Sequence, residues 1–357
     1  MRHLFLINPA AGKKDHTREF QAQIAAACSG LEYEVQVSRK PGDITALARQ
    51  AAQSGEPLRI YACGGDGTLN EVINGVVGFP HVAITHFPGG SGNDFIKIFC
   101  DTAPFFQLET LLDPAEAEFD LISCNDDYAL NVCSLGLDAR IAAEASRYKR
   151  LPLVTGSGAY ALSALVNTIK GIHRPYRIAL DGEVLDGRFT LVFVGNGRWY
   201  GGGFHPMPDA DPCDGLLDVL LIQPVSRLQV FAIIGKYKAG RYAEYPALIR
   251  HVRTRHLEVQ CPAPVEINLD GELRWAQRVQ IGVAKEKIRF FYPKTLTWKP
   301  ICPVCLSVYS APTVQDLSAL VVFSSNLPGI LPGHFHVHKI LTEKRGISSC
   351  IFPRVAL

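Results

Sequence analysis

Apolar and polar positions alternate with two different periods along the first 90 residues. Short apolar or strictly alternating runs are typical of β-strands, and apolar residues three or four positions apart are typical of helices with one buried face. The predicted strands are Leu4–Ile7, Tyr33–Val37, Ile60–Cys63 and Val82–Phe87. Helical spacing covers Thr17–Ala27 and the segment after Asp43, which we expect to cap its helix. Strands that alternate with helices predict a parallel sheet with helices on its faces.

Residues 58–77 depart most from an ordinary strand–helix connection. The predicted strand ends at a glycine-rich loop, Gly64–Gly67, whose one side chain is the carboxylate of Asp66. The apolar residues that follow have helical spacing. Thr68 and Glu71 have the spacing of a capping box, so we expect the helix to begin at Thr68.

A glycine loop between a strand and a helix can bind a phosphate, because backbone N–H groups point outward and the helix dipole favours an anion. Asp66 would repel such a ligand unless a cation lay between them, so the loop indicates a metal–nucleotide complex. No Lys-Ser or Lys-Thr pair follows the glycines, which excludes a Walker-type loop. The alternative is a plain turn in which the glycines serve geometry only.

A second glycine loop follows the next strand. Gly89–Phe95 again combines glycines with a hydroxyl, Ser91, and one carboxylate, Asp94. The loop Asn8–Lys13 follows the first strand in the same way. Ligands of parallel sheets bind beyond the carboxyl ends of the strands, so we expect these three loops to form one site.

The pattern changes near Asp120, where we place a domain boundary. Helices are predicted at Asp138–Tyr148, Ala159–Ile172 and Leu228–Lys238. The predicted strands are Glu118–Ser123, Tyr128–Cys133, Tyr176–Leu180, Phe189–Gly195, Leu217–Ile222, Leu257–Gln260, Val265–Leu269, Gln277–Val283 and Lys287–Tyr292. Runs of strands joined by tight turns predict an antiparallel second domain. The sequence thus predicts an α/β domain over 1–120 and a β-rich domain over 121–300.

The composition is that of a soluble globular protein, with 47% hydrophobic and 20% charged residues among 357. A net charge of +2 is too small to indicate a nucleic-acid partner. The ten cysteines are scattered, as expected for reduced thiols in the cytoplasm. The apolar start is too short for a signal peptide, and no stretch approaches the roughly 20 apolar residues of a membrane-spanning helix. We expect a protein that is soluble or lies on a membrane surface.

Residues 301–357 show few strong periodicities and many Ser, Pro and His residues. Cys302 and Cys305 have metal-ligand spacing, but no second pair of this kind follows. The alternating His334, His336 and His338 are likewise unsupported by other ligands. We therefore expect an appended, poorly ordered tail.

These residues and their order resemble the bacterial diacylglycerol kinase and lipid kinase family, part of the NAD kinase-like superfamily. The motifs occur in the family's order over about residues 2 to 298. They are Asn8–Lys13, GGDGTLNEV at Gly64–Val72, GGSGNDF at Gly89–Phe95, Asn131 through Gly136 to Asp138, Asp211–Leu216, and Leu269-Asp270-Gly271-Glu272. The resemblance implies a nucleotide-binding α/β domain and a β-sandwich-like domain with the active site between them.

The resemblance also implies the ligands of this site. ATP would contact Asn8, Pro9, Ala10, Ala11, Gly12, Ser38, Gly64, Gly65, Asp66, Gly67, Thr68, Leu69, Asn70 and Ser91. Ser38 and Ser91 stand where the family commonly has Thr, and both keep the hydroxyl.

Two Mg²⁺ ions are implied as well. Asp66, Asp94 and Asp120 would hold a catalytic ion through water. Asp214, with main-chain oxygens of Asp211 and Leu216, would hold a structural one. Hard oxygen ligands fit Mg²⁺ rather than zinc. An ordinary turn at 211–215 is the alternative.

Glu272 would be the general base that takes the proton from the lipid hydroxyl. The chain contains two Asp-Gly-Glu triplets, Asp181–Glu183 and Asp270–Glu272. The first lies between two short strand-like runs and is expected to be a hairpin turn. By its order in the family, the second is the catalytic one.

The resembling family phosphorylates lipid alcohols, with diacylglycerol as the default acceptor and phosphatidic acid as the product. Sphingoid bases and phosphatidylglycerol are alternative acceptors, and a NAD kinase-type enzyme or a non-catalytic nucleotide-binding regulator are alternative functions. We expect a cytoplasmic protein on the inner face of the membrane. The basic segment at residues 147–151 is a candidate contact, and a solvated helix end is the alternative. Whether it is a monomer or a homodimer stays open.

Overall fold

The computed structural model describes residues 1–148, 166 and 171–298. The chain in this part builds two β-sheets, which belong to one compact unit. The helix predicted at Ala159–Ile172, the basic segment at 147–151 and the tail at 301–357 lie wholly or mostly outside the described side chains.

The first sheet has six strands in the order β2-β1-β3-β4-β16-β5. Its strands are β1 (Arg2–Ile7), β2 (Tyr33–Val37), β3 (Leu58–Gly64), β4 (Val82–Pro88), β5 (Pro114–Phe119) and β16 (Ile288–Pro293). The helices of this half are α1 (Thr17–Ala27), α2 (Asp43–Ala52), α3 (Asp66–Val76) and α4 (Leu108–Leu112), with short 3₁₀ turns η1 (Phe95–Phe99) and η2 (Ala103–Phe106). Strands β1 to β4 are mutually parallel, as predicted.

The second sheet is antiparallel throughout its described pairings. Its strands are β6 (Ile122–Cys124), β7 (Asp127–Ala129), β8 (Val132–Gly136), β9 (Arg174–Leu180), β10 (Glu183–Phe189), β11 (Leu191–Gly195), β12 (Leu217–Ile222), β13 (Ile249–Thr254), β14 (His256–Leu269) and β15 (Glu272–Val283). Two helices, α5 (Leu137–Tyr148) and α7 (Arg227–Lys238), and the 3₁₀ turn η3 (Tyr242–Glu244) accompany them. The predicted fold class, a parallel α/β half and an antiparallel half, is confirmed.

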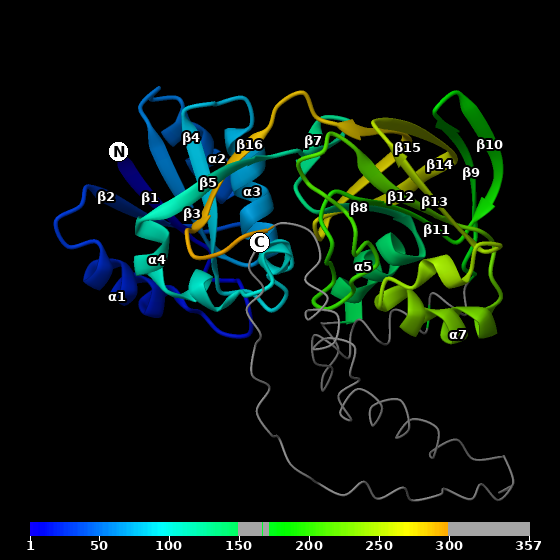
Figure 1. The fold of residues 1–357 in the computed structure, drawn as a ribbon, viewed down its shortest axis with the longest axis horizontal. Coiled ribbons are helices and arrows are strands. Elements are labelled where there is room, and N and C mark those ends of the chain that lie inside the picture. The colour runs from blue at the N-terminus through cyan, green and yellow to red at the C-terminus, as the bar shows by residue number, and fades with distance from the viewer. Residues whose placement is uncertain (149–165, 167–170, 299–357) are drawn as a thin grey trace, which may run out of the picture. The chain divides into compact units, whose positions relative to one another are not determined.

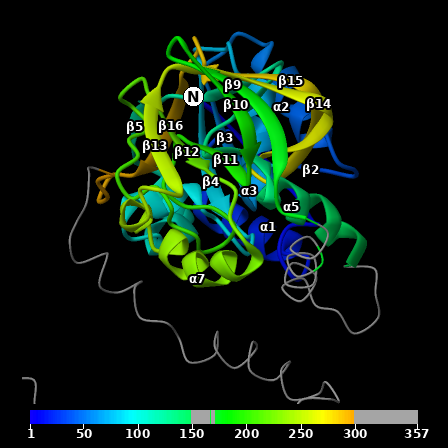
Figure 2. The ribbon, with the colours of Figure 1, turned by 90° about the vertical axis from the view of Figure 1, so that its right-hand side faces the viewer.

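Strand β14 gives the second sheet its sandwich-like curvature. Residues 257–260 pair with β9, whereas residues 267–269 pair with β8, and the register against β15 shifts between Gln260 and Val265. A bulge of this kind bends a strand and lets it serve two layers. The two strands predicted at 257–260 and 265–269 are therefore one bent strand. Figure 2 shows β9 and β10 next to β14 and β15.

Strand β16 belongs to the first sheet, so its predicted place in the second domain is wrong. Its residues, predicted as Lys287–Tyr292 in the second domain, pair in parallel with β4 and antiparallel with β5 of the first sheet. In Figure 1 the orange β16 returns among the blue and cyan strands. Phe290 and Phe291 are fully buried there, and this burial of apolar surface stabilises the return of the chain to the first sheet.

Two predicted helix starts are also wrong. Helix α3 begins at Asp66, and no side chain caps it, because its N-cap residue is Gly65. Thr68 lies within the first turn, where its hydroxyl accepts a hydrogen bond from Asn8. Helix α2 begins at Asp43 after Gly42, which has a left-handed conformation. The Asp43 carboxylate accepts from the preceding N–H groups of Arg39 and Lys40 rather than from the helix.

The strands predicted at 118–123 and 128–133 are each interrupted. Asp120 separates β5 from β6, and its N–H donates to Pro212 O at 2.7 Å instead of joining a ladder. The N–H groups of Leu130 and Asn131 likewise donate to the carboxylate of Asp270. Side-chain and loop acceptors thus replace strand pairing at two places between the sheets.

Candidate active site

Three loops meet at the carboxyl edge of the first sheet. Strands β1, β3 and β4 end in register, so the loops after Ile7, Gly64 and Pro88 start side by side. The Gly64 carbonyl accepts hydrogen bonds from Gly89 N at 2.7 Å, Gly90 N at 3.1 Å and the imidazole of His86 at 2.8 Å. This one acceptor ties the two glycine loops together.

The loop glycines are needed for close approach of the backbones. A Cβ on Gly90 would lie 2.4 Å from the Cα of Gly65. One on Gly12, which has a φ of +80°, would lie 2.5 Å from the carbonyl oxygen of Gly89. Distances this short exclude any side chain without movement of the backbone. The first loop thus also contacts the third.

Asn8 connects the first loop to α3. Its side-chain oxygen accepts from Ala10 N at 3.0 Å, and its amide nitrogen donates to the Thr68 hydroxyl at 3.1 Å. Ser38, which follows β2, is buried, and its N–H donates to Ile7 O at 2.9 Å. The residues expected to contact ATP therefore share one edge, with an exception at Asn70. Its amide donates away from the loops, to Tyr128 O at 3.0 Å.

Asp66 and Asp94 face one another across the two glycine loops. Asp66 accepts a hydrogen bond from the backbone N–H of Asp94 at 2.6 Å, and Asp94 accepts one from Gly202 N at 2.8 Å. Lys97 forms an ion pair with Asp94. Burial and then the nearby Asp94 raise the pKa of Asp66 to about 7. Such a pair of carboxylates is stabilised by a bound cation.

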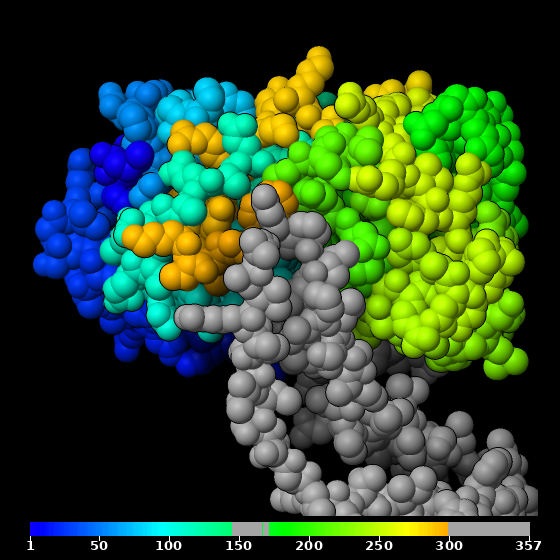
Figure 3. Space-filling view, in the orientation of Figure 1, coloured from blue at the N-terminus to red at the C-terminus, as the bar shows by residue number. Residues whose placement is uncertain are grey.

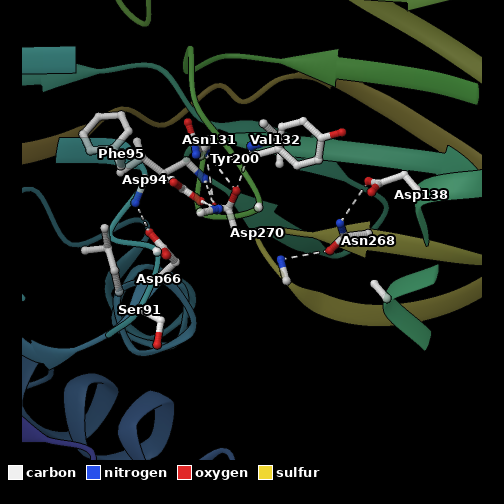
Figure 4. Close-up of a pocket in the computed structure, with 17 residues that line it drawn as sticks. Asp66, Ser91, Asp94, Phe95, Asn131, Val132, Asp138, Tyr200, Asn268 and Asp270 are labelled. Carbon is white, nitrogen blue, oxygen red and sulfur yellow. Dashed lines mark hydrogen bonds between the residues drawn. The ribbon is translucent and has the colours of Figure 1, made fainter. Parts of the chain in front are cut away.

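The opposite wall is built by Asp270 of the β14–β15 hairpin. Its carboxylate accepts from the N–H groups of Leu130, Asn131 and Val132 at 2.7 to 3.2 Å. Burial raises the pKa of Asp270 to about 6 although these hydrogen bonds oppose the rise. Figure 4 shows Asp270 opposite Asp66 and Asp94. The carboxylate thus anchors the hairpin to the start of β8.

We call the space between these walls the cleft. It has a volume of about 310 Å³ and is lined from both sheets, and the lining includes Asp66, Leu69, Ser91, Asp94, Asn131, Asp138, Tyr200, Asn268 and Asp270. Asp138 accepts hydrogen bonds from Ser134 and Asn268, and burial raises its pKa. The cleft joins a glycine-loop edge to a polar wall of the second sheet.

The two Asp-Gly-Glu triplets have the same backbone turn and different surroundings. Both Asp and both Gly residues have positive φ, as a two-residue hairpin requires. Glu183 is exposed and pairs with Arg250 at 2.6 Å. Glu272 instead lies beside Gly67, since a Cβ on that glycine would be 3.3 Å from its Oε1. Burial raises the pKa of Glu272, and the nearby charge of Arg274 partly opposes this rise.

Asp120 lies apart from the other two carboxylates of its predicted set. It is buried outside the lining of the cleft, where it pairs with Lys287 at 2.8 Å and accepts from Gly215 N at 2.8 Å. It therefore connects to the 211–216 loop rather than directly to Asp66.

The loop 211–216 is shaped by its own carboxylates. Asp211 accepts from Cys213 N, and Asp214 accepts from Leu216 N, each at 3.0 Å, while Arg253 pairs with Asp214. Within residues 1–148 and 171–298, no three His, Cys, Asp or Glu side chains are gathered closely enough to hold a metal ion. The roles assigned to these carboxylates remain predictions.

Three contributors to the site were missed in the sequence. His86 is a buried histidine in an otherwise mostly apolar strand, and its polarity is the signal that could have drawn attention to it. Asp270 belongs to a recognised triplet but had no role of its own. Gly202 lies in a run of three glycines, 201–203, which is an unused signal of close backbone approach.

A second space adjoins the cleft, and we call it the apolar groove. It measures about 340 Å³ and shares Asp138, Tyr200 and Gly201 with the lining of the cleft. Most of its other lining is hydrophobic: Leu137, Ile141, Leu191, Phe204, Ile222, Val225, Val230, Ile233, Ile234 and Tyr237. The groove lies against α7, and such a surface suits a hydrocarbon chain.

Comparison with known proteins gives the family. Residues 2–124 match the diacylglycerol kinase catalytic domain, and residues 131–291 match the YegS C-terminal NAD kinase beta sandwich-like domain. A relative from Shewanella frigidimarina, named "Probable lipid kinase YegS-like", is 28% identical over 294 residues, which are 80% of this chain and 90% of the relative.

A solved structure shares the fold. A diacylglycerol kinase from Bacillus anthracis superposes with a TM-score of 0.61 at 21% identity, covering 83% of this chain and 98% of that one. At this identity the likeness concerns the fold alone. Both domain types and the curated relatives agree with the resemblance seen in the motifs. The chain belongs to the diacylglycerol kinase and lipid kinase family.

Proposed function

We propose that the protein is an ATP-dependent kinase that transfers the γ-phosphoryl group to the hydroxyl of a lipid alcohol, with diacylglycerol as the first candidate. One observation carries the proposal. The cleft has glycine loops and two carboxylates at one end and continues into an apolar groove at the other. A phosphate donor and a hydrocarbon acceptor can therefore meet within it.

The nucleotide end uses the loops of the first sheet. The N-terminus of α3 begins at Asp66, directly after the glycines, and favours an anion through its unpaired N–H groups. We assign the ATP phosphates to Gly64–Leu69 and Ser91, without Asn70, whose amide is bonded to Tyr128 O. Asn8–Gly12 and Ser38 lie along the same edge and would bind the rest of the nucleotide.

The carboxylates fit a hard cation. Asp66 and Asp94 are close and buried, and both offer oxygen ligands, although Lys97 pairs with Asp94 in their present arrangement. When bound there, Mg²⁺ would neutralise charge on the phosphates. Asp120 would act through the 211–216 loop to which it is bonded. Asp214, Asp211 and Leu216 are our candidates for a second, structural ion.

Glu272 is our candidate for the general base. It lies beside Gly67 in the first turn of α3, where the nucleotide loop ends, and burial raises its pKa toward the range in which a carboxylate accepts a proton efficiently. Asp270 positions it by fixing the hairpin to β8. Little further chemistry is required, because phosphoryl transfer depends mainly on positioning and charge stabilisation.

The apolar groove is our candidate for the acyl chains of the acceptor. A sphingoid base or phosphatidylglycerol would present a hydroxyl and a hydrocarbon chain in the same way. The protein would then work in the cytoplasm at the inner face of the membrane. The part of the chain that the structure describes contains no helix with the length and apolarity to cross a bilayer.

The test is a transfer assay with γ-labelled ATP and Mg²⁺. Diacylglycerol, a sphingoid base, phosphatidylglycerol and NAD are offered separately in detergent mixed micelles. Label in one or more of the lipids supports the proposal. Label in NAD alone would indicate a NAD kinase-type enzyme, and label in no acceptor would indicate a nucleotide-binding regulator.

A further inference from the structure

Helix α7 exposes apolar side chains on its outer face. Leu228 is 82% exposed, Phe231 55% and Ile234 42%, and these are its exposed large hydrophobic residues. They are spaced three residues apart, so they follow one side of the helix. Burying a leucine or phenylalanine would be favourable by about 2 kcal/mol each, so this face is costly in water.

The other side of α7 is apolar too. Ile233 and Tyr237 are buried, and with Val230 and Ile234 they line the apolar groove. A helix that is apolar on both sides needs an apolar environment on both. The body of the protein supplies one of them. Figure 1 shows α7 along the lower edge of the second half, and Figure 3 shows yellow-green atoms of this region at the surface.

The charged residues of α7 indicate what kind of partner its exposed apolar face contacts. Its residues include Arg227 at the first turn, Lys236 and Lys238 at the last, and no acidic residue. Lys238 lies over the ring of Phe204, and Lys236 pairs with Glu244. Cations at both ends of an apolar stretch are typical of helices that lie in the interface of an anionic membrane.

We propose that α7 docks the protein on an anionic phospholipid bilayer, with Leu228, Phe231 and Ile234 inserted among the lipids. This inference rests on the proposed function, since it assigns the membrane from which the acceptor enters. Ile234 belongs both to the outer face and to the lining of the groove. A docked α7 therefore places the groove next to the hydrocarbon of the bilayer. A lipid can then pass its chains along α7 without crossing water.

The test compares binding of the full chain to vesicles without nucleotide. The variant L228S/F231S removes the two most exposed side chains, and L31S/F106S removes the same residue types from exposed sites in the first half, where Leu31 is 43% and Phe106 48% exposed. We expect wild type and the control to sediment with phosphatidylglycerol-containing vesicles and less with pure phosphatidylcholine. The partition coefficient of L228S/F231S should fall at least about tenfold.

Two readouts separate docking from catalysis. L228S/F231S should keep wild-type turnover of a short-chain acceptor dispersed in detergent and lose turnover of the same headgroup in vesicles. If no acceptor is phosphorylated and vesicle binding still depends on α7, the docking surface stands and the kinase proposal fails. Equal vesicle binding by wild type and L228S/F231S overturns the docking proposal. So does a wild-type dimer that this variant dissociates without any change in vesicle binding.

Discussion

The carboxylate of Asp66 accepts the backbone N–H of Asp94 at 2.6 Å, which places two acidic side chains from neighbouring loops at one point of the cleft. Neither carboxylate belongs to a group of three metal-ligating side chains in the described residues. The arrangement keeps a negative charge enclosed, at a cost that the raised pKa of Asp66 reflects.

We predict that Asp66→Asn abolishes phosphoryl transfer and preserves the fold. The amide oxygen can still accept the N–H of Asp94, and the enclosed charge is removed, so the melting temperature should stay level or rise. Turnover should fall by about 10³-fold or more, because the charge that would balance a cation is lost. Melting curves and the labelled-ATP assay measure the two effects. Asp101→Asn, an exposed site of the same half, should leave both unchanged.

His86 should control both nucleotide affinity and stability in acid. Its imidazole donates to Gly64 O, the acceptor shared by both glycine loops. His86→Gln keeps a donor at this position and His86→Phe removes it. We expect KM for ATP to rise about tenfold in the Phe variant and much less in the Gln variant. Equal KM values for the two variants would contradict this role.

Burial lowers the pKa of His86 to about 4 from an ordinary value of 6.5. The unfolded chain therefore binds the proton first, so this contribution to stability is fully present above pH 6.5 and is lost as pH falls toward 4. The difference corresponds to about 3 kcal/mol. Urea unfolding at pH 7 and pH 4.5 should show a smaller acid loss for His86→Gln than for wild type. An identical pH dependence would show that His86 is not responsible.

Asp270→Asn should lower both stability and turnover. The carboxylate accepts three backbone N–H groups, whereas an amide can offer only its oxygen. We expect a loss of about 1–3 kcal/mol in the free energy of unfolding. Turnover should fall further than the folded fraction does, since the hairpin that carries Glu272 loses its anchor. Asp181→Asn, in the matching exposed turn, is the control and should keep full turnover.

The apolar groove predicts selectivity for acyl-chain length. Val230→Trp fills it from α7, so KM should rise severalfold for long-chain acceptors in micelles and stay near the wild-type value for short-chain ones. Ala232→Trp adds the same ring on the exposed side of the helix. A uniform change of KM across chain lengths would argue against acyl binding in the groove.

Local patterns were enough to predict most strands and helices of the first half, because the apolar residues of each element recur with a clear period. Both β2 and α1 have their predicted bounds. Sheet membership could not be predicted in the same way. The segment at 288–293 has a strand pattern wherever it pairs, and its burial with the first sheet depends on residues at least 169 positions away.

The candidate site likewise has features that could be predicted from local sequence and features that depend on the tertiary fold. Glycine loops carry their signal in the sequence, since only glycine permits backbones to approach as Gly65 and Gly90 do. The role of Asp270 could not be predicted, because its partners at residues 130–132 are brought to it by the tertiary fold. The same is true of Asp120, whose contacts with Lys287 and Gly215 set it apart from Asp66.

The two Asp-Gly-Glu triplets allow the most direct test of the account, since they share a turn and differ in where the turn lies. Glu272→Gln and Glu183→Gln are compared with wild type for transfer of label from γ-labelled ATP to the best lipid acceptor, with vesicle binding and melting temperature as controls. We predict that Glu272→Gln loses transfer by about 10³-fold with binding and melting unchanged, whereas Glu183→Gln retains full transfer. Full transfer by Glu272→Gln, or loss only in Glu183→Gln, would contradict the proposal that Glu272 is the general base of phosphoryl transfer.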